Sequence, residues 1–259
     1  MSYKAKKSYG QHFLTDLNIA SRIVDHITYS EDLNVLEIGP GQGVLTDFLT
    51  TKAINLKLIE ADIDMVNVLN RKYPEMSQNI VHFDFLKADL NRIFDGKELT
   101  IVGNFPYNIS SQIIFRMLKH YKIVPEMVGM FQLEVAERIV SPPGSKKYGV
   151  ISVLAQAVYD GELLITVDPD VFDPPPKVMS GVIRLRRKEN INFDYNRSLF
   201  KHIVKTAFNQ RRKMLRNTLK SLVEKTNFVD EELLMKRPEQ LSVEDFINLT
   251  NKLDVENES

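Results

Sequence analysis

A short apolar run leads directly into a glycine-rich turn and then into a helical stretch, and this order constrains the fold more than any other feature. The run is Asn34–Ile38, the turn is Gly39-Pro40-Gly41-Gln42-Gly43, and the helical stretch is Val44–Thr50. Strand-like and helix-like segments continue to alternate up to about residue 140. Such alternation indicates a parallel sheet with helices on both faces. The sequence therefore predicts an α/β domain.

The chain changes character near residues 188–196. From Arg197 to the end the periodicity is helical, and Asp16 and Ser242 are expected to cap the first and the last helix of the chain. We therefore expect an α/β domain over 1–190 and an α-helical domain over 191–259. Before the boundary, the predicted strands are 33–38, 55–60, 79–83, 98–103, 126–131, 150–159, 163–167 and 178–186, and the predicted helices are 16–27, 43–51, 62–72, 109–121 and 132–140.

Composition narrows the class of protein. The chain has 259 residues, 43% of them hydrophobic, which is enough for one large core and a small second one. It contains no cysteine, so disulfides and thiolate chemistry are excluded. Its first residues are polar and basic, no apolar run is long enough to span a membrane, and the five histidines show no metal-ligand spacing. We expect a cytoplasmic protein with no metal and no membrane attachment.

Acidic residues follow two further strands after the glycine-rich turn. The turn has G-x-G-x-G spacing, and Val44 stands where a dinucleotide fingerprint requires its third glycine, which argues against NAD. Glu60 is placed to accept hydrogen bonds from ribose hydroxyls, and Asp84 to accept one from an adenine amine. Each acid alone is more often a solvated loop residue. Together the strand ends predict an S-adenosylmethionine pocket formed by Gly39, Gly41, Glu60 and Asp84.

The segment Asn104-Phe105-Pro106-Tyr107 follows the apolar run 99–103. The N6 amine of adenine is a poor nucleophile because its lone pair is delocalised into the ring. The Asn104 side-chain oxygen and a backbone carbonyl beside Pro106 are suited to accept its two N–H bonds, while Tyr107 stacks on the ring. The segment thus predicts N6 methylation of adenine, although these four residues alone are about as compatible with a simple turn after a strand.

The net charge of +0 hides two opposite regions. Residues 196–226 contain nine basic residues against one acid, a net of +8, whereas 227–259 contain nine acids against three bases, a net of −6. A basic cluster is the electrostatic footprint of a phosphate backbone, although most charge runs are only solvated helix faces. The candidate RNA-binding residues, expected on a helix, are Arg211, Arg212, Lys213 and Arg216.

Six motifs extend over nearly the whole chain: Gly10–Leu14, Glu37–Gly43, Asn104–Ser110, Phe131–Arg138, Phe172–Val178 and Phe208–Asn217. Together they resemble the KsgA/RsmA family of 16S rRNA adenine N6,N6-dimethyltransferases. The resemblance implies a class I (Rossmann-like) S-adenosylmethionine-dependent methyltransferase domain with a small C-terminal α-helical domain. It also implies methylation of two adjacent adenosines in a hairpin loop near the 3′ end of 16S rRNA, within an immature small ribosomal subunit and without an obligate protein partner.

The resemblance also assigns individual residues. It implies cofactor contacts from His12, Leu14, Gly39, Glu60, Asp84 and Asn104. Phe172 is the candidate for a second aromatic wall opposite Tyr107, and a core phenylalanine is an equally good interpretation of that position. Two residues depart from the family pattern: Phe105 replaces a leucine and Leu133 replaces a lysine.

Three other functions remain open. An antibiotic-resistance methyltransferase acting on one adenine of large-subunit rRNA would share the cofactor and Asn-x-Pro-Tyr motifs, but the run 208–213 and the unbroken Pro174-Pro175-Pro176 favour the small-subunit enzyme. A DNA adenine methyltransferase would normally need a larger recognition domain than the residues after Asn196 provide. An inactive assembly factor would not need to keep Asn104 and Tyr107.

Overall fold

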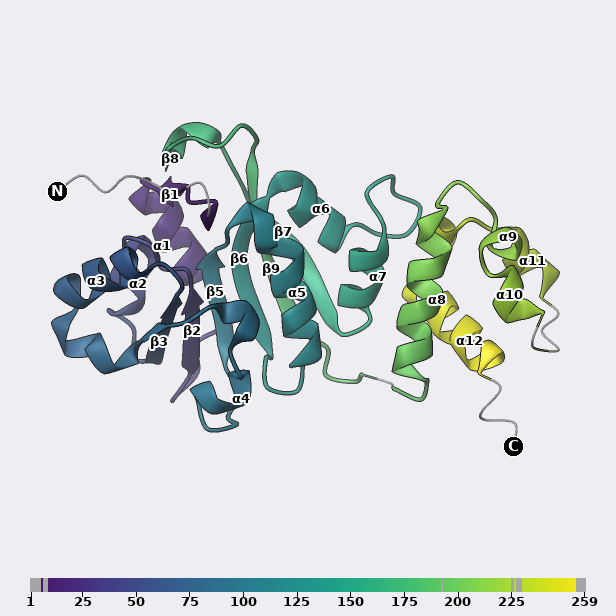
Figure 1. Cartoon of the computed structure of the whole chain (residues 1–259), viewed down its shortest axis with the longest axis horizontal. Helices are drawn as coiled ribbons and strands as arrows, with labels where there is room; N and C mark the ends of the chain where they lie inside the picture. Colours follow the sequence, from purple (N-terminus) through teal and green to yellow (C-terminus); the bar gives the residue numbers. More distant parts are fainter. Residues whose placement is uncertain (1–5, 7–8, 192, 225, 227–229, 255–259) are drawn as a thin grey trace. The chain divides into compact units, whose positions relative to one another are not determined.

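The structure is a computed structural model that describes residues 6, 9–191, 193–224, 226 and 230–254 (Figure 1). Its strands are β1 (Phe13–Leu14), β2 (Asn34–Ile38), β3 (Asn55–Glu60), β4 (Ile80–His82), β5 (Thr100–Asn104), β6 (Glu126–Gln132), β7 (Tyr159–Val167), β8 (Phe172–Asp173) and β9 (Ser180–Arg187). Its α-helices are α1 (Leu17–Asp25), α2 (Val44–Leu49), α3 (Ile63–Lys72), α4 (Leu90–Ile93), α5 (Ser110–Lys119), α6 (Leu133–Val140), α7 (Val150–Gln156), α8 (Arg197–Asn209), α9 (Leu215–Thr218), α10 (Lys220–Val223), α11 (Glu231–Met235) and α12 (Val243–Leu253).

Seven strands form the central sheet in the order β4-β3-β2-β5-β6-β9-β7 (Figure 1). The neighbours from β4 to β6 run parallel, as the alternation of strands and helices predicts, whereas β9 runs antiparallel to β6. From β2 the chain builds the sheet toward β3 and β4, and it later returns to the other side of β2 to add β5 and β6. Ligands bind α/β sheets at such a reversal, outside the carboxyl ends of the strands.

The central strands are buried on both faces, which is why their sequences are nearly continuous apolar runs. Val35, Leu58, Val102, Val128 and Val182 are all 0% exposed and belong to one hydrophobic cluster. Burial of this kind stabilises the sheet by about 25 cal/mol for each Å² of apolar surface removed from water. At the carboxyl ends of β3 and β5 the apolar runs give way to polar residues, Glu60 and Asn104, and these two positions mark the candidate site.

The chain divides into two compact units. The first comprises Met1–Ala136 and Asp160–Arg187, and the second comprises Glu137–Tyr159 and Lys188–Ser259. One division therefore lies close to the boundary expected at residue 190, but the segment 137–159 belongs with the C-terminal helices rather than with the sheet. In the second unit α8 packs on α12, and the Phe208 and Phe246 ring centroids lie 6.0 Å apart.

The strand predicted over 150–159 is wrong for most of its length. The structure forms α7 there, at Val150–Gln156, and β7 begins only at Tyr159. Five consecutive residues of α7 are buried, Ile151 to Ala155. A helix buried on all sides shows no 3.6-residue periodicity, so its β-branched run resembles a strand.

The helix predicted to carry Arg211, Arg212 and Lys213 ends before them. Helix α8 ends at Asn209, and a turn separates it from α9, which begins at Leu215. The predicted N-terminal caps of other helices are confirmed. Asp16 accepts hydrogen bonds from the N–H groups of Asn18 and Ile19, and Ser242 accepts one from Asp245.

Candidate active site

A cavity of about 420 Å³ lies in the first unit, at the carboxyl ends of β2, β3, β4 and β5. It is the location that the strand order favours for a ligand. The cavity brings together nine of the predicted site residues, His12, Leu14, Gly39, Gly41, Glu60, Asp84, Asn104, Pro106 and Tyr107. These residues come from segments far apart in the sequence, so the fold itself assembles the site.

The glycine-rich turn lets the backbone pass close to the cavity. Gly39 and Gly41 have φ angles of +63° and +55°, which residues with a Cβ atom rarely adopt. A Cβ atom on Gly41 would lie 2.9 Å from Cε1 of Phe13, so this position has no room for a side chain. The turn therefore presents backbone rather than side chains to a ligand.

Glu60 ends β3 with its carboxylate inside the cavity wall. The residue is 6% exposed, and its oxygens accept hydrogen bonds from the N–H groups of Gly41 at 3.2 Å and Asp62 at 2.9 Å. Burial raises the pKa of Glu60, and these backbone hydrogen bonds act in the opposite direction. Each carboxylate oxygen has two lone pairs, so the group keeps acceptor capacity for a ligand hydroxyl.

Asp84 follows β4 and is half-buried. Its Oδ1 accepts a hydrogen bond from the N–H of Leu86 at 2.9 Å, and its Oδ2 lies 3.6 Å from Nζ of Lys87. The ion pair is exposed and contributes little to stability. The backbone hydrogen bond holds the carboxylate at the rim of the cavity, beside Phe83, which is 47% exposed.

Asn104 ends β5 with its amide in a defined orientation. Its Nδ2 donates a hydrogen bond to the carbonyl of His12 at 2.9 Å. Because a carbonyl only accepts, the nitrogen must face His12 and the oxygen must point elsewhere. Among the described residues, the structure shows no donor to Asn104 Oδ1. The site therefore offers a fixed acceptor at the end of a buried strand.

Tyr107 is held at both its ring and its hydroxyl. The hydroxyl lies 2.5 Å from Oγ of Ser180, and burial raises the pKa of Tyr107. The His12 ring stacks on the Tyr107 ring with centroids 5.4 Å apart, and His12 Nδ1 donates to the carbonyl of Pro174 at 2.7 Å. One face of Tyr107 is therefore already covered by an imidazole.

Phe172 does not line this cavity and does not form a second aromatic wall in the structure. It is 4% exposed and belongs to the hydrophobic cluster of the first unit. Its strand, β8, pairs antiparallel with β1, and Phe172 stands opposite Leu14. The interpretation as a core phenylalanine is the one that the structure supports.

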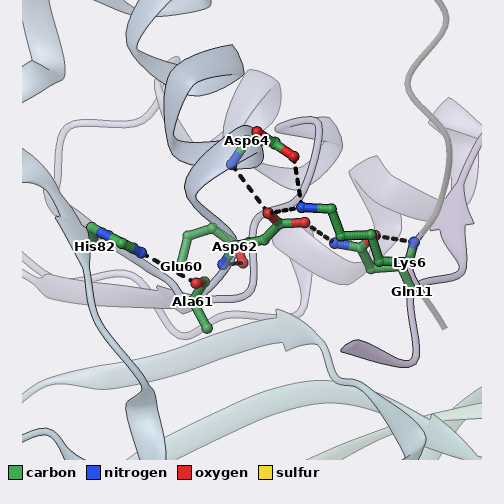
Figure 2. Close-up of polar contacts among 7 residues, drawn as sticks. All are labelled: Lys6, Gln11, Glu60, Ala61, Asp62, Asp64 and His82. Atoms are coloured by element: carbon green, nitrogen blue, oxygen red, sulfur yellow. Dashed lines mark hydrogen bonds and ion pairs between the residues drawn. The ribbon is translucent and has the colours of Figure 1, made fainter. Parts of the chain in front are cut away.

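Three polar residues in the cavity or beside it have no counterpart in the sequence-based prediction. Glu37 lines the cavity at 1% exposure, accepts a hydrogen bond from Thr46 Oγ1 at 2.6 Å, and has its pKa raised by burial to about 8. Gln11 also lines the cavity and binds Asp62, which is 0% exposed (Figure 2). An acid within an apolar strand is the one local signal that could have identified Glu37.

The four candidate RNA-binding residues lie in the second unit and differ in their surroundings. Arg211 donates to the backbone carbonyls of Ser145 and Lys146, and its Nε lies 3.8 Å from Oε2 of Glu239. Arg212, Lys213 and Arg216 are exposed, and within the described part of the chain no acidic partner is found for them. Arg211 thus holds a loop, whereas the other three side chains face solvent.

Within the described residues, no group of three or more His, Asp or Glu side chains is placed to hold a metal ion. None of the described helices is both long enough and apolar enough to cross a membrane.

Known proteins that are similar to this chain point to one family. A family model described as ribosomal RNA adenine dimethylase matches residues 2–254. A ribosomal RNA small subunit methyltransferase A from Phocaeicola vulgatus is 51% identical over 252 residues, covering 97% of this chain and 90% of that protein. The protein of the same name from Flavobacterium johnsoniae is 51% identical over 253 residues, covering 98% and 97%.

Two solved structures share the fold. A dimethyladenosine transferase from Plasmodium falciparum has a TM-score of 0.77 at 25% identity and covers 95% of this chain and 98% of that chain. The 23S rRNA methyltransferase ErmE has a TM-score of 0.65 at 24% identity and covers 92% and 99%, a likeness of fold. The resemblance of the six sequence motifs is thereby confirmed, and the chain belongs to the ribosomal RNA adenine dimethylase family.

Proposed function

We propose that the protein uses S-adenosylmethionine to dimethylate N6 of two adjacent adenosines in the hairpin loop near the 3′ end of 16S rRNA. The orientation of the Asn104 amide carries this proposal, because it presents an oxygen acceptor at the end of β5 beside a pocket of cofactor size. Relatives at 51% identity are named for small-subunit ribosomal RNA, which supports the choice of substrate. We place the reaction in the cytoplasm, on an immature small subunit and without an obligate protein partner.

The cavity residues fit S-adenosylmethionine in their chemistry. The bare backbone at Gly39 and Gly41 accommodates the close approach of a ligand, and the Glu60 carboxylate supplies an acceptor for ribose hydroxyls. Asp84 supplies an acceptor for an adenine amine, and His12 and Leu14 of the N-terminal part of the chain line the same cavity. When bound, the sulfonium supplies an activated methyl group, so no strong base is needed for transfer.

The protein then has to position the target amine and exclude water. Asn104 Oδ1 and a backbone carbonyl next to Pro106 accept the two N–H bonds of adenine N6, which directs the nitrogen lone pair toward the methyl group. Tyr107 supports the base by stacking and is itself fixed through Ser180. The target base must be unstacked, which costs little in a hairpin loop.

The proposed RNA surface comprises the exposed Arg212, Lys213 and Arg216, with Arg211 acting by holding the loop at Ser145. Replacing the three exposed residues with Gln should weaken subunit binding and reduce the slope of log affinity against log salt by about 0.7 to 0.9 for each lost phosphate contact. Arg211→Gln is the matched variant and should change the slope less. An unchanged slope in the folded triple variant would remove this surface from the proposal.

One assay tests the proposed function. Radiolabelled S-adenosylmethionine is incubated with immature small subunits, immature large subunits and duplex DNA, and the label in each nucleic acid is counted. We expect label only in small-subunit RNA. Label in large-subunit RNA would instead indicate the antibiotic-resistance activity, and no label in any substrate would indicate an assembly factor.

A further inference from the structure

A buried acid outside the cavity, Asp62, binds Lys6 and Gln11 of the N-terminal part of the chain beside the proposed cofactor site. Asp62, at the start of α3, is 0% exposed, and its carboxylate accepts hydrogen bonds from Nε2 of Gln11 at 3.0 Å and Nζ of Lys6 at 2.6 Å (Figure 2). The same carboxylate caps α3 through the N–H of Asp64. A buried carboxylate without such partners would be costly, so this cluster strongly favours one position of the N-terminal segment.

The cluster is joined to the cofactor side through the backbone of Asp62. The N–H of Asp62 donates to Oε1 of Glu60, the carboxylate that is proposed to bind ribose. The other oxygen of Glu60 is held by the N–H of Gly41. Neither of these hydrogen bonds to Glu60 involves the side chain of Gln11.

The residue after Gln11 contacts Asn104, the proposed ligand of the target adenine. Gln11 is followed by His12, whose carbonyl accepts the hydrogen bond that orients Asn104. Oε1 of Gln11 accepts from the backbone N–H of Lys6, so both ends of its amide are used (Figure 2). Gly10 precedes it with a φ of +61°, and a Cβ atom there would lie 2.9 Å from Oδ1 of Asn108. Residues 10–12 therefore fit closely and have little freedom to shift without moving the His12 carbonyl.

We infer that Gln11 and Asp62 are positioning residues for methyl transfer, because their hydrogen bond fixes the His12 carbonyl and thereby the acceptor oxygen of Asn104. The inference rests on the proposed function of Asn104. Neither residue needs to touch the reacting atoms. Loss of the hydrogen bond lowers turnover, because a misplacement of about 1 Å is enough to slow a reaction about 100-fold. Cofactor affinity falls less than turnover does, because the hydrogen bonds that hold Glu60 come from Gly41 and Asp62 and not from Gln11.

The first test compares Gln11→Met with Gln78→Met. Met keeps the length of the side chain but removes its donor and acceptor, and Gln78 is exposed on the short helix Pro74–Asn79, away from the cavity. We expect Gln11→Met to lower kcat about tenfold or more, with a clearly smaller change in the Kd for S-adenosylmethionine. Gln78→Met should match wild type in both.

A reciprocal swap separates the hydrogen bond from a general loss of structure. Gln11→Glu alone places two carboxylates together and should lower kcat. Adding Asp62→Asn restores the bond with its direction reversed, since the new amide donates to the new carboxylate, and the charge of the cluster is unchanged. The double variant should recover kcat to within about threefold of wild type. Recovery would assign the loss of kcat in the single variant to the hydrogen bond between the two side chains.

A readout independent of catalysis keeps the inference separate from the proposed function. In NMR spectra of the ligand-free protein, the Asn104 side-chain amide protons should lose protection from exchange in Gln11→Met and keep it in Gln78→Met. Unchanged protection would overturn the inference even if the wild-type protein transferred no methyl group. Three other results would overturn it as well. They are a wild-type kcat in Gln11→Met, an equal fall in kcat and cofactor affinity in that variant, and failure of the swap to recover kcat.

Discussion

Gly129 lies in β6 opposite Gly103 of β5, and the ring of Phe105 occupies the space above both glycines. A Cβ atom on Gly129 would lie 2.0 Å from Cε2 of Phe105 and 2.8 Å from Cζ, whereas carbon atoms pack best at about 3.5 to 4.0 Å. Phe105 is 1% exposed, so the ring cannot turn into solvent. Gly129→Ala should therefore force Phe105, and Asn104 beside it, out of position.

The expected cost of Gly129→Ala is about 1 to 3 kcal/mol in the free energy of unfolding, the usual range for overpacking a core. Phe105→Leu alone should also destabilise the protein, because it leaves a cavity above the glycines. In the double variant the smaller leucine makes room for the new methyl group. We expect the two changes to couple favourably by about 1 kcal/mol or more. The same pairing explains how this chain accommodates phenylalanine where the family pattern has leucine.

Urea denaturation of the wild type, both single variants and the double variant measures this coupling, and kcat measured on the same samples reports the position of Asn104. The double variant should be more stable than Gly129→Ala and should turn over faster. Additive effects within about 0.3 to 0.5 kcal/mol would refute the packing argument. So would a Gly129→Ala variant as stable as wild type.

Three further changes test the site. Asn104→Ala should lower kcat by about 10²- to 10³-fold, as loss of a transition-state hydrogen bond does, with a much smaller change in cofactor Kd, and single-turnover kinetics near wild type would remove Asn104 from the mechanism. Glu60→Ala should weaken binding of S-adenosylmethionine by about 1.5 to 3 kcal/mol in calorimetry, and an unchanged Kd would show that Glu60 is not a ligand. Glu37 has a pKa raised from 4.5 to about 8, so the native protein holds a proton that the unfolded chain releases, and its contribution to stability is lost as pH rises through that window. Glu37→Gln should flatten this decline in denaturation curves, and a decline of the same size in the variant would assign it to another group.

The residues that could be predicted from the sequence are those that differ in polarity from the residues next to them in the chain. Glu60 and Asn104 are polar residues at the ends of apolar runs, and the carboxyl ends of parallel strands meet at one edge of a sheet. Their convergence on one cavity follows from the alternation of strands and helices alone. Caps such as Asp16 and Ser242 are similarly local, because the donors lie within three residues.

The features that escaped prediction depend on contacts between distant residues. Gln11 and Asp62 are 51 residues apart, and neither shows a local signal that it is buried against the other. Arg211 belongs to a basic run, yet its guanidinium is directed to backbone carbonyls 65 and 66 residues away. Phe172 is an aromatic residue of the kind that can stack on a base, but the pairing of β8 with β1 places it in the core. Sequence composition does not distinguish such positions, because only the folded chain selects their partners.

The most direct test of the account is the identity of the product. The protein is incubated with S-adenosylmethionine and immature small subunits, the 16S rRNA is digested to nucleosides, and these are analysed by mass spectrometry, with Asn104→Ala as the matched control. We expect N6,N6-dimethyladenosine at two adjacent positions of the hairpin loop near the 3′ end, and little or none with the variant. Methylation at another atom of the base, or equal dimethylation by Asn104→Ala, would contradict it.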